Sequence, residues 1–466
     1  MDVKTRSTVH QSTEYSRRID LLGFMFKYLH YTFLGPSQET MDSTWKRRLY
    51  SLVQFITLFS YIPALLCTAL GLYEFRHDIR DITDILVTTV PFLTSFPTGF
   101  YFIRNWNQIK KFMVSMETDS YFTSPFVHSK GNLLRIIEDT KKKCVFLTKF
   151  LVITEFIGLT SFFFKPFILS YLEESQINLT EEESIRKQWK NMIYVIWLPV
   201  DPRKPLVFYS VYIYQLFTAL VFFCHSSSVI NINFVLIRYS AVQFTLTCKA
   251  LSQTDILTSS FTLKSKNDSE MLINEYPTQS EIDSESQSFL GDLTDSSFHQ
   301  DTSAQQGRET EESFNYVRQC IILHQSAISF ATEMNALLSP LIVMYLLNPS
   351  FALVVSSFQF AMGGGIEKNM PYFCVSVVAL AETFALCWFG QKLIDESLAV
   401  EQTVYNMQWY YQSSSVKEIV SFIIMRAQNA VELKETGFPN VSIATFSMII
   451  NASYQWFTVL LNMLNE

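Results

Sequence analysis

Four ionisable side chains lie inside long apolar stretches of the sequence: Lys149, Glu155, Lys165 and Glu382. A charge in such a stretch is costly to bury, so the group pairs with a neighbour or marks a functional position. The two lysines are close enough to the ends of their stretch for the ammonium groups to reach the two aqueous faces. Glu155 and Glu382 lie in the middle of theirs. For them we expect either structural bonds to hydroxyls and lysines or a part in a binding site.

A second set of polar side chains interrupts the uncharged stretch 441–464 near the C-terminus. As a helix with a rise of about 1.5 Å per residue, this stretch can cross a hydrocarbon core of about 30 Å. Each amide or hydroxyl in lipid would need a hydrogen-bond partner. The pattern therefore predicts a membrane helix that faces protein or a watery pore. The polar residues are Asn451, Ser453, Gln455, Thr458 and Asn462.

Long apolar helices are the elements expected to position these groups. The chain has 466 residues, 48% of them hydrophobic, with only 13 Gly and 14 Pro, which favours an all-α membrane protein. The fourth apolar run continues to Ile237, so its helix is predicted to protrude from the membrane. The seven predicted transmembrane helices are Leu49–Tyr73, Ile85–Ile103, Cys144–Tyr171, Leu206–Ile230, Leu337–Phe360, Tyr372–Gln391 and Val441–Leu464.

The distribution of positive charge predicts the orientation of these helices. Of the 34 Lys and Arg residues outside the spans, 26 lie in the N-terminal segment and in the loops 104–143, 236–325 and 392–440. Because cytoplasmic loops carry the excess of Lys and Arg, the N-terminus is predicted to be cytosolic. After seven spans the C-terminus is then extracellular. The sequon at Asn178 falls in a predicted external loop and indicates a glycosylation site.

One internal segment, 255–313, differs from the rest in composition. It holds 13 acidic and 3 basic residues and is rich in Ser, Thr and Gln. Because it cannot bury a core, we expect a disordered acidic cytosolic insert that acts as a solvated spacer, with a docking site as the alternative. The predicted division of the chain is a cytosolic N-terminal segment 1–48, helices one to four with a cytosolic extension 49–254, the insert 255–313, helices five and six 314–392, a cytosolic helical segment 393–440, and the last helix 441–466.

Several function classes fit the sequence poorly. It contains no HExxH, no GxSxG, no P-loop and no Gly-rich dinucleotide turn, so we expect neither an enzyme nor a metal or cofactor site. A G-protein-coupled receptor would have its N-terminus outside, and the only Asn-Pro pair, Asn348-Pro349, lies in the fifth predicted span. A transporter would be expected to show an internal repeat with broken helices, and the sequence shows none.

Four runs in the C-terminal part of the chain, taken in order, resemble the insect odorant receptors. The region 320–347 is similar to the fifth helix of that family. The resemblance covers roughly the last third of the chain in sequence, and the whole chain in span number and topology. The four runs are AETFALCWFGQKLIDES at 381–397, VYNMQWY at 404–410, IIMRAQNAVEL at 423–433 and SYQWFTVLL at 453–461.

The resemblance implies a tetrameric odorant-gated cation channel in the plasma membrane of sensory neurons. Cytosolic segments would form an anchor domain where subunits meet, and the last helix of each subunit would line one central pore. Small volatile odorants would bind between the second, third, fourth and sixth helices, and cations and membrane lipid are the further expected partners. Gustatory receptors share this topology and remain an alternative, with a G-protein-coupled receptor or a transporter less favoured.

Two features bear on which kind of receptor this would be. The stretch QWFTVLLNML at 455–464 departs from the last helix of the shared co-receptor and favours an odorant-binding subunit. The insert 255–313 is nevertheless similar to the long loop of the co-receptor. An early-branching receptor that forms a homotetramer and a subunit that forms a heterotetramer with the odorant co-receptor are therefore both open.

The resemblance also suggests where the pore closes. The hydrophobic gate of the family falls on Val459, with Asn462 and Met463 one helical turn away. A ring of four Val side chains would close a narrow pore by dewetting, and the amide oxygen of Asn462 would face passing cations. Simple helix packing is the alternative interpretation of Val459.

Apolar and aromatic stripes on the implied pocket helices would form its walls, although each stripe alone is more often core packing. Tyr209 and Tyr372 would each offer a hydrogen bond to a ligand oxygen. Glu155 and Glu382 are either structural or select ligands that carry a donor, such as an alcohol or an amine. The predicted ligand-binding residues are Phe92, Phe96, Glu155, Gly158, Phe162, Tyr209, Ile213, Tyr372 and Val375.

Overall fold

The computed structural model describes residues 21–118, 127, 131–173, 180–253, 287–362, 366–435 and 437–465. Within these ranges every regular element is a helix. Six helical segments are long and apolar enough to cross a membrane: Thr44–Glu74, Ile79–Arg104, Gly131–Leu169, Pro205–Ser252, Glu311–Ala361 and Asn369–Asn406. They correspond to the first six predicted spans, and the predicted all-α membrane fold is confirmed. The seventh predicted span is helix α17 (Ile443–Asn465), which is not among these six segments.

Two of the predicted spans are broken helices. The first consists of α4 (Thr44–Phe59) and α5 (Tyr61–Glu74), which meet at Ser60. The third consists of α9 (Gly131–Phe163) and α10 (Lys165–Glu173), where a single helix was predicted. Pro166 explains the second break, because it has no N–H to donate and its ring clashes with the preceding turn, whereas it fits the first turn of a new helix.

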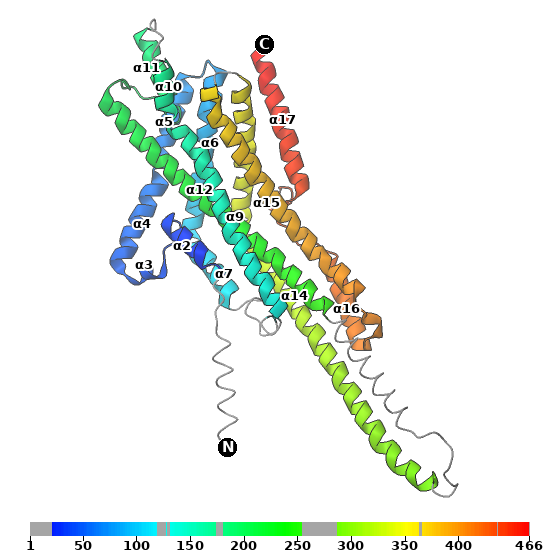
Figure 1. Ribbon diagram of the computed structural model, residues 1–466. Helices are drawn as coiled ribbons and strands as arrows, with labels where there is room; N and C mark the ends of the chain where they lie inside the picture. Colours follow the sequence, from blue (N-terminus) through cyan, green and yellow to red (C-terminus); the bar gives the residue numbers. More distant parts are fainter. Residues whose placement is uncertain are drawn as a thin grey trace.

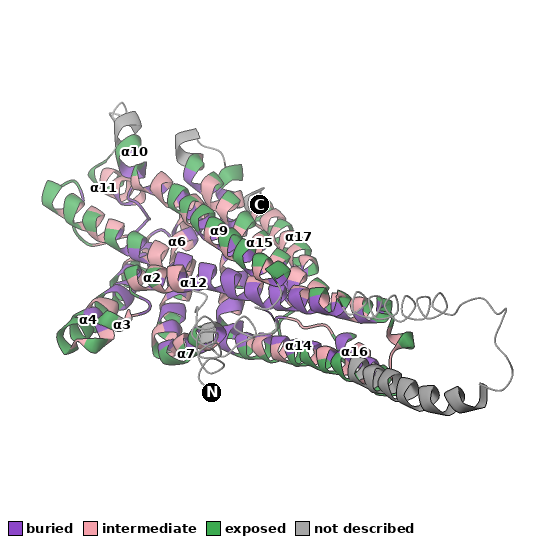
Figure 2. Ribbon diagram, turned by 60° about the horizontal axis from the view of Figure 1, so that its bottom comes forward, coloured by how far each residue is buried: buried purple, intermediate pink, exposed green. Residues whose placement is uncertain are grey.

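The long helix α12 (Pro205–Ser252) is the centre of the molecule. Its second half, from Ser227 to Leu251, is buried almost throughout, as the purple ribbon in Figure 2 shows. It contacts α9, α14 (Gln287–Ala361) and α15 (Ile366–Asn406). The same hydrophobic cluster takes in residues of α2 (Gly23–Tyr31), α7 (Trp106–Thr118) and α16 (Ser414–Ala427). The predicted extension of the fourth helix beyond Ile230 is confirmed.

The start of α14 corrects the prediction for the acidic insert. We expected 255–313 to be disordered throughout, but α14 begins at Gln287 and runs for 75 residues. No proline lies between Pro277 and Pro340, and a helix that is already nucleated in the packed part adds further residues at little cost. Residues 254–286 lie outside the described part of the chain.

After α16 the chain runs back along α15 and α14 before α17 begins. The Lys434 N–H donates to Asn335 Oδ1 at 3.0 Å, and Asn335 Nδ2 donates back to the Lys434 carbonyl. At the start of α17, a Cβ on Gly390 of α15 would overlap the Val441 carbonyl, so glycine is required for this close approach.

The two ends of the molecule carry different elements (Figure 1). Helices α10 and α11 (Glu181–Lys190) and the C-terminal end of α17 lie at one end, while α7, α16 and the first part of α14 lie at the other. This arrangement agrees with the grouping of loops predicted from charge. Which end faces the cytosol remains a prediction.

Candidate functional site

A cavity of about 170 Å³ lies among five helices. Its walls come from α6 (Ile79–Arg104), α9, the first half of α12, α14 and α15, together with Ile193 and Tyr194 from the segment that precedes α12. The lining is mostly apolar, with Phe92, Phe162 and Phe222 as its largest side chains. A cavity of about 150 Å³ with such walls holds a benzene-sized molecule.

Five of the nine predicted ligand-binding residues line this cavity: Phe92, Glu155, Gly158, Phe162 and Val375. They come from α6, α9 and α15, as the helical spacing indicated. Gly158 keeps the wall open, because a Cβ there would already lie 3.2 Å from Val378 Cγ2. The structure brings these residues together, and ligand binding by them remains a prediction.

The other four predicted residues lie elsewhere. Tyr209 and Ile213 are 56% and 63% exposed, on the outer surface of α12. The placement of these two at the cavity is wrong, because an apolar stripe that faces lipid has the same spacing as one that faces a pocket. Phe96 packs edge-on against Phe59 at 6.0 Å. Tyr372 lies behind the cavity wall, with its ring edge-on to Phe162 at 6.3 Å.

Part of the wall comes from a segment that we did not associate with the pocket. Gln215 of α12 fixes it: its Oε1 accepts from the Ile193 N–H at 3.1 Å, and its Nε2 donates to the Tyr194 carbonyl at 2.9 Å. The Tyr194 hydroxyl is 2.9 Å from that of Thr218. A signal was present in the apolar run MIYVIWL at 192–198, which is too short to span a membrane and yet too apolar for an exposed loop.

The fifth predicted span also contributes, through Asn348, Pro349 and Ala352 of α14. Pro349 cannot donate to the carbonyl of Tyr345 one turn before it, so the helix has a local gap in its bonding. The Oδ1 atom of Asn348 is buried and has no hydrogen-bond partner among the described residues. From the sequence, the Asn-Pro pair served only as evidence against a G-protein-coupled receptor. Its position at the cavity was not predicted.

Glu155 and Glu382 both line the cavity, from α9 and α15. Glu155 is only 9% exposed, and its Oε1 atom has no hydrogen-bond partner within the described part of the chain. No Lys, Arg or His belongs to the described lining, and neither glutamate takes part in an ion pair among the described residues. The suggested pairing of these glutamates with the lysines is therefore wrong: Lys149 is exposed, and Lys165 pairs with Asp84.

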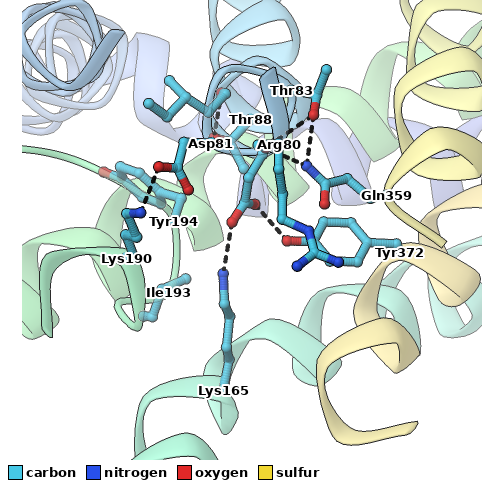
Figure 3. A network of polar contacts seen from close by, with 12 residues as sticks. Arg80, Asp81, Thr83, Thr88, Lys165, Lys190, Ile193, Tyr194, Gln359 and Tyr372 are labelled. Carbon is cyan, nitrogen blue, oxygen red and sulfur yellow. Dashed lines mark hydrogen bonds and ion pairs between the residues drawn. The ribbon is translucent and has the colours of Figure 1, made fainter. Parts of the chain in front are cut away.

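A polar network ties the helices together beside the cavity (Figure 3). Asp84 of α6 lies between Lys165 Nζ, at 3.5 Å, and the Tyr372 hydroxyl, which donates to it at 2.6 Å. Gln359 of α14 donates to the Arg80 carbonyl and to Thr83 Oγ1, at 2.6 and 2.7 Å. The network thus joins α6, α10, α14 and α15 directly behind Phe162.

Helix α17, the predicted pore helix, packs on α14 and α15 through one side only. Its Ile450 contacts the cluster formed by Ala352, Leu353 and Ala379, and the two alanines also line the cavity. The opposite side is open: Val459 is 46% exposed, Met463 is 59% exposed, and Asn462 is exposed as well.

The predicted glycosylation site, Asn178, lies outside the described residues.

Comparisons with known proteins agree with this architecture. The family described as "7tm Odorant receptor" matches residues 78–454. Odorant receptor 67c of Drosophila melanogaster is 26% identical over 152 residues, which cover 33% of this chain and 37% of that protein. The odorant receptor coreceptor of Anopheles gambiae is 25% identical over 144 residues, 30% of each chain. The chain thus matches about a third of the length of these relatives.

A solved structure extends the likeness to the whole fold. The insect olfactory receptor OR5 from Machilis hrabei, in complex with eugenol, superposes with a TM-score of 0.69 at 15% identity, covering 97% of this chain and 100% of that one. The family match sets aside the gustatory receptor, G-protein-coupled receptor and transporter alternatives. The chain belongs to the 7tm odorant receptor family of insects, a family of receptors and not of enzymes.

Proposed function

We propose that the chain is a subunit of an odorant-gated, non-selective cation channel. A small, mainly apolar molecule binds in the cavity among α6, α9, α12, α14 and α15, and its binding opens a pore lined by α17. The observation that carries this proposal is the cavity of about 170 Å³ among five helices in a member of this receptor family. Its size suits a molecule with one ring or a short chain.

The contact between the cavity wall and α17 offers a route from binding to opening. Ala352 and Ala379 face the cavity and also belong to the cluster that Ile450 of α17 packs against. A ligand that fills the cavity pushes on these alanines and so changes how α17 packs against them. Because α17 packs mainly on α14 and α15 among the described helices, we expect a small shift at this contact to move the whole helix.

The exposed side of α17 is proposed to face the axis of a tetramer. There Val459 forms the hydrophobic gate, while Asn462 and Met463 lie beside it in the conduction path. Exposed apolar side chains near α16 support subunit contacts at the other end of the molecule: Tyr405, Tyr411, Phe422 and Met425 are each at least 60% exposed. We place that end in the cytosol of a sensory neuron and the C-terminus outside the cell.

The subunit composition of the proposed tetramer has two alternatives. The matched relatives include both odorant receptors and a coreceptor, and we propose either a homotetramer or a heterotetramer with the co-receptor. Whole-cell recording of this chain, expressed by itself and together with a co-receptor, tests the proposal against an odorant panel. We expect odour-evoked cation current in at least one of the two conditions. Normal surface expression with no current in either would overturn the channel assignment.

A further inference from the structure

The cavity lining contains buried hydrogen-bond acceptors that lack a donor among the described residues. Glu155 Oε1 and Asn348 Oδ1 are buried without partners among the described residues, and Glu382 places a second carboxyl in the same lining. Glu382 also borders a small neighbouring void of about 10 Å³ together with Asn233 and Tyr345. An apolar ligand would leave Glu155 Oε1 and Asn348 Oδ1 without a donor, and a buried acceptor without a partner is costly.

Two of the three hydroxyl groups in the described lining, those of Thr88 and Tyr194, are already engaged, and Ser226 carries the third. Thr88 donates to the Ile85 carbonyl at 3.1 Å, and the Tyr194 hydroxyl shares a hydrogen bond with Thr218. A ligand that carries N–H or O–H groups can supply the missing donors. A primary ammonium group has three N–H donors and no acceptor, so it matches this lining, whereas an alcohol brings one donor and adds acceptors of its own.

Charge and the aromatic walls favour the same class of ligand. Two carboxyl groups line one apolar cavity, and the described lining holds no basic side chain to balance them. A ligand cation supplies the opposite charge. Phe92 lies edge-on to Tyr194 at 5.2 Å and to Phe222 at 5.7 Å, and such a cluster of rings attracts a cation through its faces. The remaining walls are apolar, so the rest of the ligand is a ring or a short alkyl chain.

We propose that this cavity takes small primary amines with an apolar or aromatic body, and that Glu155 and Glu382 hold the ammonium group with help from Asn348. This inference rests on the proposed function, because it assigns a ligand class to the same cavity.

Three compounds of similar shape separate the amine inference from the channel proposal: 2-phenylethylamine, 2-phenylethanol and propylbenzene. Charge-assisted hydrogen bonds contribute about 1.5–3 kcal/mol, so the amine is expected to act at a concentration about 10–100-fold lower than propylbenzene in whole-cell recordings. Glu155→Gln and Glu382→Gln keep the size of the side chain and remove its charge. Each is expected to reduce the ratio of propylbenzene to amine half-maximal concentrations by at least about tenfold.

Thr88→Val is the matched control, because it changes a cavity side chain whose hydroxyl is already bonded within α6. It is expected to keep the preference for the amine. Equal potency of the alcohol and the amine, or an amine preference that survives both glutamate substitutions, would overturn the amine inference and leave the channel proposal standing.

A second readout covers the case in which none of the compounds evokes current. Thermal unfolding of the purified wild-type receptor with each compound measures binding without gating. The amine should raise the melting temperature more than propylbenzene does, and this difference should disappear in Glu155→Gln. A melting temperature that the amine leaves unchanged would refute the inference, whatever the outcome for the channel.

Discussion

Two regions along α12 differ in how their side chains pack. From Ser227 to Leu251 nearly every side chain is buried in one continuous cluster, which joins seven other helices of the described residues. Around Ala219 and Phe222 the helices instead meet through three smaller clusters and line the cavity. The first region stabilises the subunit through close packing. The second keeps free volume and unpaired polar atoms, and a ligand can supply the contacts that are missing there.

The largest expected difference is in stability, between a Leu→Ala substitution in the continuous cluster and one at the cavity. Leu236 is fully buried in the continuous cluster, so Leu236→Ala is expected to cost about 2–5 kcal/mol. Leu159 lines the cavity and already lacks neighbours on one side, so Leu159→Ala costs less. Thermal unfolding of the detergent-solubilised receptor measures both. Equal losses of stability would break the proposed contrast.

The network beside the cavity should be sensitive to the loss of one partner. Asp84→Asn leaves the buried ammonium of Lys165 without its carboxylate, at an expected cost of about 2 kcal/mol, which is below the range for a fully buried pair because Asp84 is 20% exposed. The double variant Asp84→Asn with Lys165→Met removes both charges and should recover most of the lost stability. A double variant less stable than Asp84→Asn would show that this pair does not explain the loss.

The contact between cavity and pore helix is expected to affect gating more than folding. Ile450→Ala removes side-chain atoms at the cluster shared with Ala352 and Ala379. We expect the opening equilibrium to fall about fivefold, seen as a lower maximal current at saturating odorant. Ligand-induced thermal stabilisation should stay the same, because the cavity keeps its lining. A variant that loses this stabilisation as well would place Ile450 in binding instead.

The smallest effect is expected outside both regions, at the start of α11. The N–H and hydroxyl of Thr180 donate to Glu183 and hold the pKa of its carboxyl below the ordinary value. The carboxylate therefore stabilises this helix start at neutral pH, and its contribution is lost as the pH falls through the lowered pKa. Hydrogen exchange at the first turn of α11 should show slightly less protection in Glu183→Gln than in wild type at neutral pH, and no difference in acid.

The sequence predicted where the first six membrane-spanning helices lie, but not the early start of α14, the breaks in two spans or the direction of some helix faces. Unbroken apolar length predicted the spans and the extension of α12, because membrane thickness constrains that length directly. It could not separate Tyr209 and Ile213, which face outward, from Phe92 and Phe162, which line the cavity, since lipid and a ligand pocket select the same apolar side chains. The wall at Ile193 and Tyr194 depends on tertiary bonds to Gln215, which no local pattern encodes.

The central claim is that a ligand in this cavity opens the channel, and a single concentration–response comparison tests it most directly. Ala219→Phe places a ring inside the cavity, while Tyr209→Ala removes one from the outer surface of the same helix. With surface expression matched, we predict that Ala219→Phe raises the half-maximal odorant concentration by at least about tenfold, whereas Tyr209→Ala leaves it unchanged. An unaltered response in Ala219→Phe would contradict the account and place the ligand site elsewhere.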